Sequence, residues 1–232
     1  MTSRPPDTPL RPIRTFGRTG GRALSARQQA LVDELLPGLT VPVGEDGALD
    51  PHALFVRLGP VCLEIGFGGG EHLLEQARRA PDTGFIGCEP FIEGMAKALT
   101  GVQEHGLDNV RLWMDDARLL MAALADASVD QAYILFPDPW PKKKQQKRRL
   151  IQPDFLDALH RILSVGARVR FATDVVSYAD EALARFTAHG GFAWLAESAD
   201  DWRVRPADHV PTRYEAKRLG DCEPVWFDFR VL

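Results

Sequence analysis

The sequence predicts an α/β protein: a doubly wound, mostly parallel sheet covered by helices. Two observations predict this fold. From residue 61 onward, short apolar runs alternate with segments of helical spacing. The first apolar run, 61–65, passes through a glycine-rich turn directly into a helical segment, 71–77, which is the opening unit of nucleotide-binding α/β sheets. A chain of 232 residues suits one such domain with an extension.

The extension is expected to occupy residues 1–53. Residues 1–24 hold five arginines against a single acid, Asp7, and are rich in Pro, Gly and Thr. A segment of this composition buries little surface and is expected to be mobile. It suits either an electrostatic tether to a polyanion or a solvated tail. Ser25 is expected to cap a short helix that runs to Leu36 and ends at Pro37-Gly38.

The predicted domain spans residues 54–232. Its strands are expected at 61–65, 84–88, 109–114, 130–136 and 167–172, and its helices at 71–77, 92–104, 117–125, 153–163 and 178–189. Two final strands, 192–196 and 225–231, have no helical segment between them. This order favours an antiparallel hairpin at one edge of the sheet.

Composition excludes several classes of protein. No apolar run approaches the roughly 20 residues that span a bilayer, and the N-terminus lacks the apolar segment of a signal peptide. The three cysteines are widely spaced, which predicts buried thiols in a reducing cytoplasm. The six histidines show no ligand spacing, so we expect no metal. A net charge of −4 means that any affinity for nucleic acid must come from local patches.

The glycine-rich turn after the first strand indicates the ligand. Its sequence is Glu64-Ile-Gly-Phe-Gly-Gly-Gly70, in which the glycines let the backbone approach a ligand closely. Dinucleotide sites need a third glycine five residues after the first, but Glu71 stands there and would oppose a diphosphate. An acid at Glu64 suits a cationic ligand, such as the sulfonium and amino group of S-adenosylmethionine. We therefore predict that Glu64, Gly66 and Gly68 contact this cofactor.

Acidic residues follow or end four predicted strands, where α/β sheets bind their ligands. They are Glu64, Glu89, Asp116 and Asp138. Glu89 is placed to accept hydrogen bonds from ribose hydroxyls, and Asp116 to accept one from the amino group of adenine. Any one of them is also explained as a helix cap. Their recurrence at four strand ends favours one shared crevice.

The most specific stretch is Leu135-Phe-Pro-Asp-Pro-Trp-Pro-Lys-Lys-Lys-Gln-Gln-Lys-Arg-Arg-Leu150. Its prolines fix φ and are expected to hold Asp138 and Trp140 at the mouth of the crevice. Six of the eight residues from 142 to 149 are basic. Isolated basic runs are mostly solvated faces. Behind a rigid acid and an aromatic residue, this run instead favours a phosphate track with a nucleobase stacked on Trp140, and hence a nucleic-acid substrate.

Four motifs together closely resemble the bacterial tRNA (guanine-N7-)-methyltransferases: Glu64-Ile-Gly-Phe-Gly, Phe136-Pro-Asp-Pro-Trp140 with its basic run, Thr173-Asp174 and Thr212-Arg-Tyr-Glu215. The resemblance extends from about residue 58 to the C-terminus. It implies a Rossmann-like methyltransferase sheet, S-adenosylmethionine as the cofactor and tRNA as the partner. The implied product is 7-methylguanosine at position 46 of the tRNA variable loop.

The resemblance also implies roles for individual residues. Glu64, Glu89, Asp116 and Asp138 would contact S-adenosylmethionine, and Asp138 would be the catalytic residue. Substrate would be contacted by Lys142, Asp174, Thr212, Arg213, Tyr214 and Glu215. RNA would be contacted by Trp140, Lys144, Gln145, Gln146, Lys147, Arg148 and Arg149. Family members often have histidine in the basic run where this chain has the two glutamines, so a histidine role does not carry over.

The chemistry of guanine N7 agrees with this expectation. N7 has an exposed lone pair and no proton, so its attack on a methyl group needs no general base and leaves a positive charge on the purine. A carboxylate such as Asp138 can orient the base and stabilise that charge. Amino-group methyltransferases have Asn/Asp-Pro-Pro-aromatic at this point, and Asp138-Pro-Trp lacks the second proline.

Two of the motifs also have a purely local explanation. Thr212 and Glu215 have the spacing of a capping box, ahead of a short predicted helix, 215–219, that Gly220 would close. Thr173-Asp174 has the composition of a cap for the helix that contains Tyr178. Capping and substrate binding are compatible, because a capped helix start also offers free N–H groups.

Two hypotheses of other classes remain open at this point. One is a non-catalytic RNA-binding protein that uses the sheet as a scaffold, which the intact Glu64–Gly70 loop disfavours. The other is an S-adenosylmethionine-dependent methyltransferase with a different substrate: another RNA base, a small molecule or a protein. The sequence leaves the oligomeric state, monomer or homodimer, undetermined.

Overall fold

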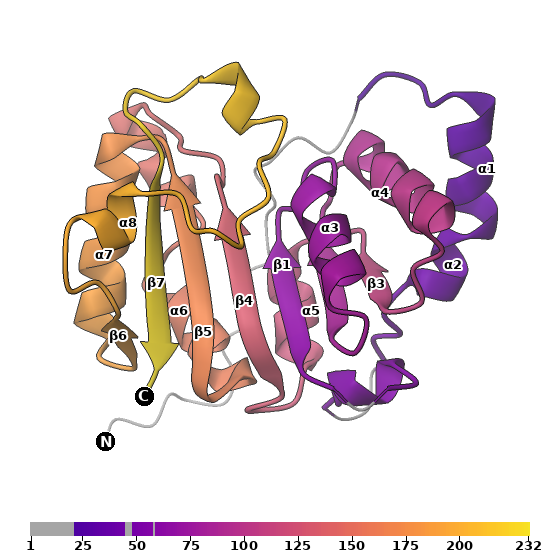
Figure 1. The fold of residues 1–232 in the computed structure, drawn as a ribbon, viewed down its shortest axis with the longest axis horizontal. Helices are drawn as coiled ribbons and strands as arrows, with labels where there is room; N and C mark the ends of the chain where they lie inside the picture. The colour runs from indigo at the N-terminus through magenta and orange to yellow at the C-terminus, as the bar shows by residue number, and fades with distance from the viewer. Residues whose placement is uncertain (1–20, 45–47, 58) are drawn as a thin grey trace.

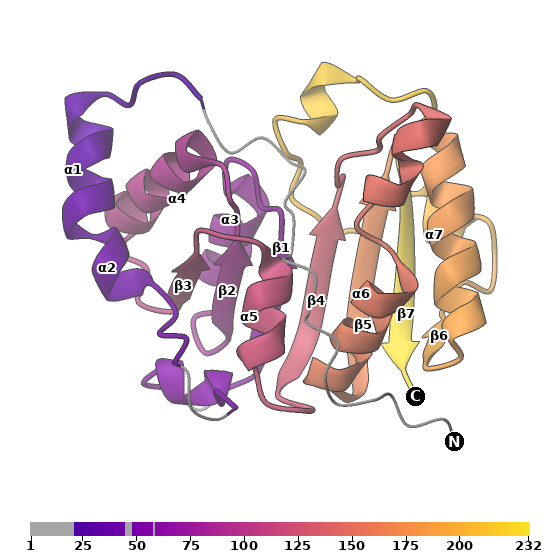
Figure 2. The same cartoon turned by 180° about the vertical axis from the view of Figure 1, so that it is seen from behind.

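The computed structural model describes residues 21–44, 48–57 and 59–232. Within these residues seven strands form one sheet in the order β3-β2-β1-β4-β5-β7-β6 (Figures 1 and 2). The strands are β1 (Val61–Ile65), β2 (Gly84–Cys88), β3 (Val110–Trp113), β4 (Val129–Leu135), β5 (Leu163–Thr173), β6 (Phe192–Trp194) and β7 (Val225–Val231). Neighbouring strands from β3 to β5 are parallel, whereas β7 is antiparallel to both β5 and β6. The predicted α/β sheet with an antiparallel edge hairpin is confirmed.

Helices cover both faces of the sheet (Figures 1 and 2). The longer helices are α1 (Ala26–Glu34), α3 (Glu71–Arg79), α4 (Ile92–His105), α5 (Ala117–Ala123), α6 (Pro153–Ile162) and α7 (Val176–His189). The short ones are α2 (Leu36–Leu39), α8 (Asp200–Arg203) and the 3-10 helices η1 (Pro51–Leu54), η2 (Lys143–Arg148) and η3 (Glu215–Lys217). Helices α1, α3 and α4 contribute to one core cluster, and α5, α6 and α7 to the other.

Successive side chains of β1 point to opposite faces of the sheet, so this one strand contributes to both core clusters. Val61, Leu63 and Ile65 pack in the cluster of α5, α6 and α7, whereas Cys62 packs in the cluster of α3 and α4. All five residues of β1 are buried, because helices cover the sheet on both sides. Glu64 is on the same face as Cys62, so this acid lies on the side of the sheet that α3 covers.

The N-terminal segment packs against the β3 edge of the sheet. Ser25 caps α1 through a capping box with Gln28, which confirms the predicted helix cap at this position. The predicted end of the helix at Pro37-Gly38 is wrong: α1 ends at Glu34, and the Pro-Gly pair lies within α2, where a proline in the first turn is tolerated. Val41 N donates to Leu112 O of β3 at 3.1 Å. Residues 1–20 of the predicted arm lie outside the described residues, and the boundary at 53/54 stays a prediction.

The C-terminal third differs most from expectation. The predicted helix 215–219 is only the 3-10 helix η3, because Arg218 adopts a left-handed φ of 45° that ends it. The short helix α8 and the 3-10 helix η2, inside the basic run, were not predicted. Strand β5 begins four residues earlier than expected, at Leu163 rather than Ala167. Among the described residues, no helix has the length and apolar character needed to cross a membrane.

Candidate active site

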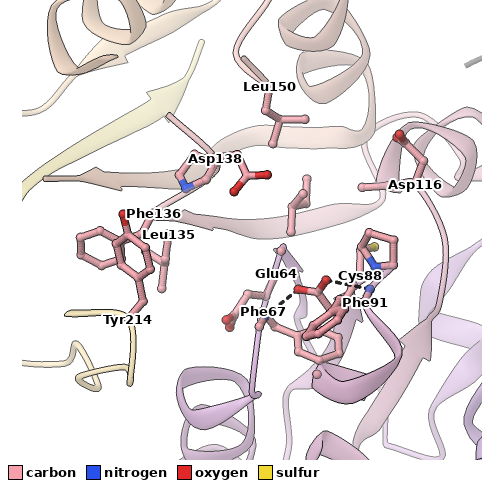
Figure 3. Close-up of a pocket in the computed structure, with 18 of the residues that line it drawn as sticks. Glu64, Phe67, Cys88, Phe91, Asp116, Leu135, Phe136, Asp138, Leu150 and Tyr214 are labelled. Atoms are coloured by element: carbon pink, nitrogen blue, oxygen red, sulfur yellow. Dashed lines mark hydrogen bonds between the residues drawn. The ribbon is translucent and has the colours of Figure 1, made fainter. Parts of the chain in front are cut away.

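A cavity of about 940 Å³ opens at the carboxyl ends of β1, β2 and β4. The chain order of the strands reverses between β1 and β4, and this reversal is where doubly wound sheets bind ligands. All four acids predicted from the strand ends line the cavity: Glu64, Glu89, Asp116 and Asp138. Figure 3 shows Glu64, Asp116 and Asp138 around it. The prediction that the four acids share one crevice is confirmed.

The loop after β1 lines the cavity with backbone. Gly66, Gly68 and Gly70 have φ values of 77°, 58° and 83°, which favour glycine. A Cβ on Gly66 or Gly68 would project into open space, on the side where both residues line the cavity. A Cβ on Gly94 of α4 would lie 2.2 Å from the carbonyl oxygen of Gly68. Glycine at position 94 therefore allows α4 to close against the loop.

The N-terminus of α3 presents a carboxylate rather than an open anion site. Helix α3 begins at Glu71, whose Oε1 lies 2.8 Å from Nε of Arg213. This carboxylate is also close to the glycine loop, since a Cβ on Gly69 would lie 2.6 Å from Glu71 Oε1. A diphosphate at this helix start would meet negative charge. The donor set of the cavity therefore fits a ligand with a cationic group better than a dinucleotide.

Glu89 is held in place by two backbone N–H groups. Gly68 N donates to its Oε2 at 2.8 Å, and Phe91 N donates to its Oε1 at 2.9 Å. Burial raises the pKa of Glu89, and the two backbone hydrogen bonds oppose that rise. Each carboxylate oxygen keeps a second lone pair. Glu89 is thus oriented and can still accept hydrogen bonds from a pair of hydroxyl groups in the cavity.

Asp116 combines a structural role with its place in the cavity. Its Oδ1 accepts a hydrogen bond from Arg118 N at 3.0 Å, which caps α5, so the capping explanation holds at this position. The Arg118 guanidinium also binds the carboxylate through both oxygens, at 2.9 and 2.7 Å. An adenine amino group that reached Asp116 would share the carboxylate with this arginine.

Glu64 forms a buried pair with a histidine. Its side chain is 3% exposed, and its Oε2 lies 2.7 Å from Nδ1 of His72, whose side chain is 1% exposed. Both residues lie on the α3 side of the sheet, where the His72 ring packs edge-on against Tyr133. The pair fixes the orientation of an acid that also lines the cavity.

The loop after β4 has backbone strain at both of its ends. Phe136 and Trp140 have φ values of 52° and 42°, which cost non-glycine residues about 1–3 kcal/mol each. Asp138 lies between them, is exposed to the cavity, and has a pKa that partial burial raises above its ordinary value. Strain of this kind persists only where the surroundings impose it, so the position of Asp138 is rigidly set.

The basic run is divided between the cavity and the outer surface. Lys147 and Arg148 line the cavity, and the Arg148 guanidinium lies 5.0 Å from the centroid of the Trp140 ring. Four other residues with expected substrate or RNA contacts lie outside the lining: Lys142, Lys144, Gln145 and Gln146. Lysines 142, 143 and 144 are exposed and lie outside the cavity lining.

Arg149 differs from its basic neighbours because its side chain is fully buried. Its Nε donates to Pro139 O and one Nη to Ser177 O, both at 2.8 Å, and it pairs with Glu181 of α7. The guanidinium also lies 4.8 Å from the Tyr178 ring centroid. These contacts fasten the loop that carries Asp138 to α7. The expected contact of Arg149 with RNA stays a prediction.

The segment 212–215 closes one side of the cavity. Thr212 N donates to Oε2 of Glu215 at 2.7 Å and Glu215 N donates to Oγ1 of Thr212 at 3.3 Å, which is the reciprocal pair of a capping box. The helix cap itself was predicted wrongly, because the N-cap residue of η3 is Tyr214 and no side chain caps it. Thr212, Arg213 and Tyr214 nevertheless line the cavity, while Glu215 lies behind them. The same residues can therefore serve both roles.

Asp174 supports this segment from outside the cavity. It is buried and its Oδ1 accepts a hydrogen bond from the Tyr214 hydroxyl at 3.3 Å. It does not cap α7, whose N-cap residue is Val175. Burial and the nearby Asp174 raise the pKa of Tyr214 to about 12, so the phenol keeps its proton. The ring centroids of Tyr214 and Phe136 are 5.5 Å apart. Figure 3 shows the two rings beside each other.

Comparisons with known proteins identify the family. Residues 59–227 match a family model described as "Putative methyltransferase". A tRNA (guanine-N(7)-)-methyltransferase of Hyphomonas neptunium is 60% identical over 219 residues, which cover 94% of this chain and all of the relative. The chain belongs to the tRNA (guanine-N(7)-)-methyltransferase family.

A second relative of the same description, from Caulobacter vibrioides, is 49% identical over 97% of both chains. Among solved structures, that of the 16S rRNA methyltransferase KamB aligns with a TM-score of 0.53. It is 16% identical and the alignment covers 83% of this chain and 98% of that chain. This likeness shows that the family shares its fold with other methyltransferases.

Some lining residues were not anticipated from the sequence. Phe91 and Lys97 lie on the α4 side of the cavity, and Arg118 lies beside Asp116. The strand-end rule could have found Phe91, which follows Glu89 by two residues. Nothing local in the sequence pairs His72 with Glu64. Across the part of the chain that the structure describes, no three His, Cys, Asp or Glu residues are grouped to hold a metal ion.

Proposed function

We propose that this protein transfers a methyl group from S-adenosylmethionine to N7 of guanosine 46 in the variable loop of tRNA. The observation that carries the proposal is the loop after β4, which holds Asp138 at the cavity and continues directly into a run of exposed lysines. The relatives named tRNA (guanine-N(7)-)-methyltransferase support the same substrate and reaction. The assignment of the methylated guanosine to position 46 is based on the resemblance of the sequence motifs to those of the family.

The acids of the cavity fit the cofactor. Glu89 is oriented by Gly68 N and would accept hydrogen bonds from the ribose hydroxyls. Asp116 would take the adenine amino group, and Glu64 would face the cationic end. Gly66 and Gly68 leave open space beside their backbone for the ligand. When bound, the cofactor supplies an electrophilic methyl group on a sulfonium sulfur.

The residues of this chain then have to orient guanine and stabilise charge. N7 loses no proton in the reaction, so the site needs no general base. We therefore assign that role to no residue. The carboxylate of Asp138 would lie near the purine and oppose the positive charge that develops on it. Thr212, Arg213 and Tyr214 would contact the base from the opposite segment, supported by Asp174 and Glu215. Lys142 would complete the substrate contacts.

The outer surface would hold the RNA backbone. Trp140, backed by Arg148, offers an aromatic face for a nucleobase. The polar and basic side chains of η2, from Lys144 to Lys147, would follow the phosphates beyond the cavity mouth. A tRNA substrate and three free cysteines fit a cytoplasmic protein.

Nucleoside analysis tests the proposal. Purified protein is incubated with methyl-labelled S-adenosylmethionine and an unmodified tRNA transcript, and the digested nucleosides are separated by mass spectrometry. We expect labelled 7-methylguanosine from the normal transcript and none from a transcript with adenosine at position 46. Label on another nucleoside would overturn the assignment of the base. Label that persists in the position-46 variant would overturn the assignment of the position.

Neutralising the outer lysines is expected to weaken tRNA binding in a salt-dependent way. The variant replaces Lys142, Lys143 and Lys144, all exposed and none on the cavity, with glutamine. Loss of three phosphate contacts should flatten the slope of log affinity against log salt concentration by about 3. Titration of labelled tRNA at several salt concentrations measures this slope, and cofactor affinity should stay unchanged.

A matched control removes the same charge from the opposite end of the sheet. It replaces Arg57, Arg168 and Arg230 with glutamine, all exposed and none on the cavity. We expect its salt slope to equal that of the unmodified protein. Equal slopes for the two triple variants would show that the basic run has no specific part in RNA binding.

A further inference from the structure

An ion pair joins the start of α3 to the segment 212–215. Arg213 Nε lies 2.8 Å from Glu71 Oε1, and both residues line the cavity. Glu71 in turn lies against the glycine loop, because a Cβ on Gly69 would be 2.6 Å from the same oxygen. The pair therefore holds the Arg213 guanidinium at the side of the cavity that the glycine loop forms.

The N–H groups of Arg213 remain available to a ligand. Its side chain is 71% exposed. Within the described part of the chain, no donor makes a hydrogen bond to the buried Oε1 of Glu71, so charge rather than a directed N–H holds the pair together. A guanidinium has five N–H donors in a planar fork, and this geometry matches the two oxygens of a carboxylate.

The acids at the strand ends give the direction in which the cofactor would lie. In the proposed function Asp116, after β3, takes adenine, Glu89, after β2, takes the ribose, and Glu64 of β1 faces the cationic end. Because the strand order is β3-β2-β1-β4, the methionine end would point towards β1 and β4. Figure 3 shows Asp116 and Tyr214 on opposite sides of the cavity, with Glu64 between them. The methionine end would thus reach the side that the segment 212–215 closes.

This end of the cofactor carries a carboxylate as well as an amino group. Glu64, Glu71 and Asp138 all line the cavity, and three acids suit the amino group but would repel the carboxylate. Arg213 balances the charge of Glu71 and has N–H groups to donate. A single carboxylate with a positive amino group beside it is therefore compatible with a site that opposes a diphosphate.

We propose that Arg213 binds the α-carboxylate at the methionine end of S-adenosylmethionine, with Glu71 holding the guanidinium beside the glycine loop. The inference rests on the proposed function and adds a cofactor contact to a residue whose motif implies contact with substrate. The two contacts are compatible, because a carboxylate bound through both oxygens uses two of the five N–H donors.

The substitution Arg213→Gln tests the contact by calorimetry with two ligands. One is S-adenosylhomocysteine, and the other is its decarboxylated analogue, which lacks only the α-carboxylate. In the unmodified protein we expect S-adenosylhomocysteine to bind about tenfold or more tightly than the analogue. In Arg213→Gln we expect S-adenosylhomocysteine to weaken by about tenfold or more and the analogue to change by less than about twofold, so the preference is lost.

Lys217→Gln is the matched control, because Lys217 is exposed, lines the cavity and follows Arg213 by one turn. It removes the same charge and should keep the preference for the carboxylate. An equal loss for both ligands in Arg213→Gln would indicate a merely structural role and overturn the proposal. Equal affinities for the two ligands in the unmodified protein would overturn it as well.

A double variant tests the place of Glu71. In Arg213→Gln, the Glu71 carboxylate is left without its counter-charge beside the carboxylate of the ligand. Adding Glu71→Gln should therefore recover about two- to fivefold of the affinity for S-adenosylhomocysteine. No recovery would contradict the placement of the carboxylate at this pair. A preparation that shows the binding preference but forms no labelled 7-methylguanosine would refute the proposed function and leave this inference standing.

Discussion

Replacing Asp138 with alanine is expected to lower kcat by about 100- to 1000-fold, which is the usual loss when an oriented group that stabilises transition-state charge is removed. The carboxylate is set by a strained loop, with left-handed backbone at Phe136 and Trp140, and it faces the cavity. Cofactor affinity should fall less, because Glu64, Glu89 and Asp116 are unchanged. Steady-state kinetics and calorimetric titration with S-adenosylhomocysteine measure the two effects.

The charge of Asp138, rather than its size, should account for the loss. Burial raises its pKa, so the carboxylate takes up a proton at a higher pH than an ordinary aspartate. As pH falls towards that raised pKa, kcat should fall with it, whereas the Asp138→Asn variant should be slow at every pH and show no such decline. Asp115→Ala, at a second acid of the cavity lining, is the control and should retain turnover. Full turnover in Asp138→Ala would exclude the role we assign to this residue.

Replacing Arg149 with glutamine is expected to lower the free energy of unfolding by about 3 kcal/mol. The substitution leaves the Glu181 carboxylate with Arg185 as its remaining partner and frees the carbonyl groups of Pro139 and Ser177. Such a loss is large against the marginal stability of a domain. Urea denaturation followed by circular dichroism measures it.

Arg148→Gln is the matched control for this experiment, since it removes the same charge one position earlier. Arg148 lies over the Trp140 ring, and both residues are partly exposed. A cation–π contact that is not buried contributes about 0.5–1 kcal/mol. We expect this variant to unfold within about 1 kcal/mol of the unmodified protein and to bind tRNA more weakly. If the two variants proved equally stable, Arg149 would not be the anchor of the loop.

Features set by neighbouring residues could be predicted from the sequence. Strands β1 and β2 and the last strand, β7, have the predicted bounds, because each is a short, largely apolar run with Gly, Pro or a polar residue on at least one side. The loop after β1 was predicted correctly because its glycines stand where a backbone turn with positive φ needs them. The shared crevice followed from parallel strands, whose carboxyl ends meet at one edge.

Features set by distant residues could not be predicted in the same way. In the run Lys147-Arg148-Arg149, all three side chains are basic, and only the path of η2 decides that Arg149 turns inward. Glu71 and Arg213 lie on segments far apart in the chain, so no local spacing indicates the ion pair that joins them. The predicted helix after Thr212 ends early because Arg218 takes a left-handed conformation.

The central claim is that guanine N7 of position 46 receives the methyl group, and a substrate that lacks this atom tests it most directly. Two tRNAs of identical sequence are prepared, one with guanosine and one with 7-deazaguanosine at position 46, and both are incubated with methyl-labelled S-adenosylmethionine. We expect stoichiometric label in the first, recovered as 7-methylguanosine, and none in the second, although both should bind with equal affinity. Equal labelling of the two tRNAs would contradict the account, because the methyl group would then be attached elsewhere.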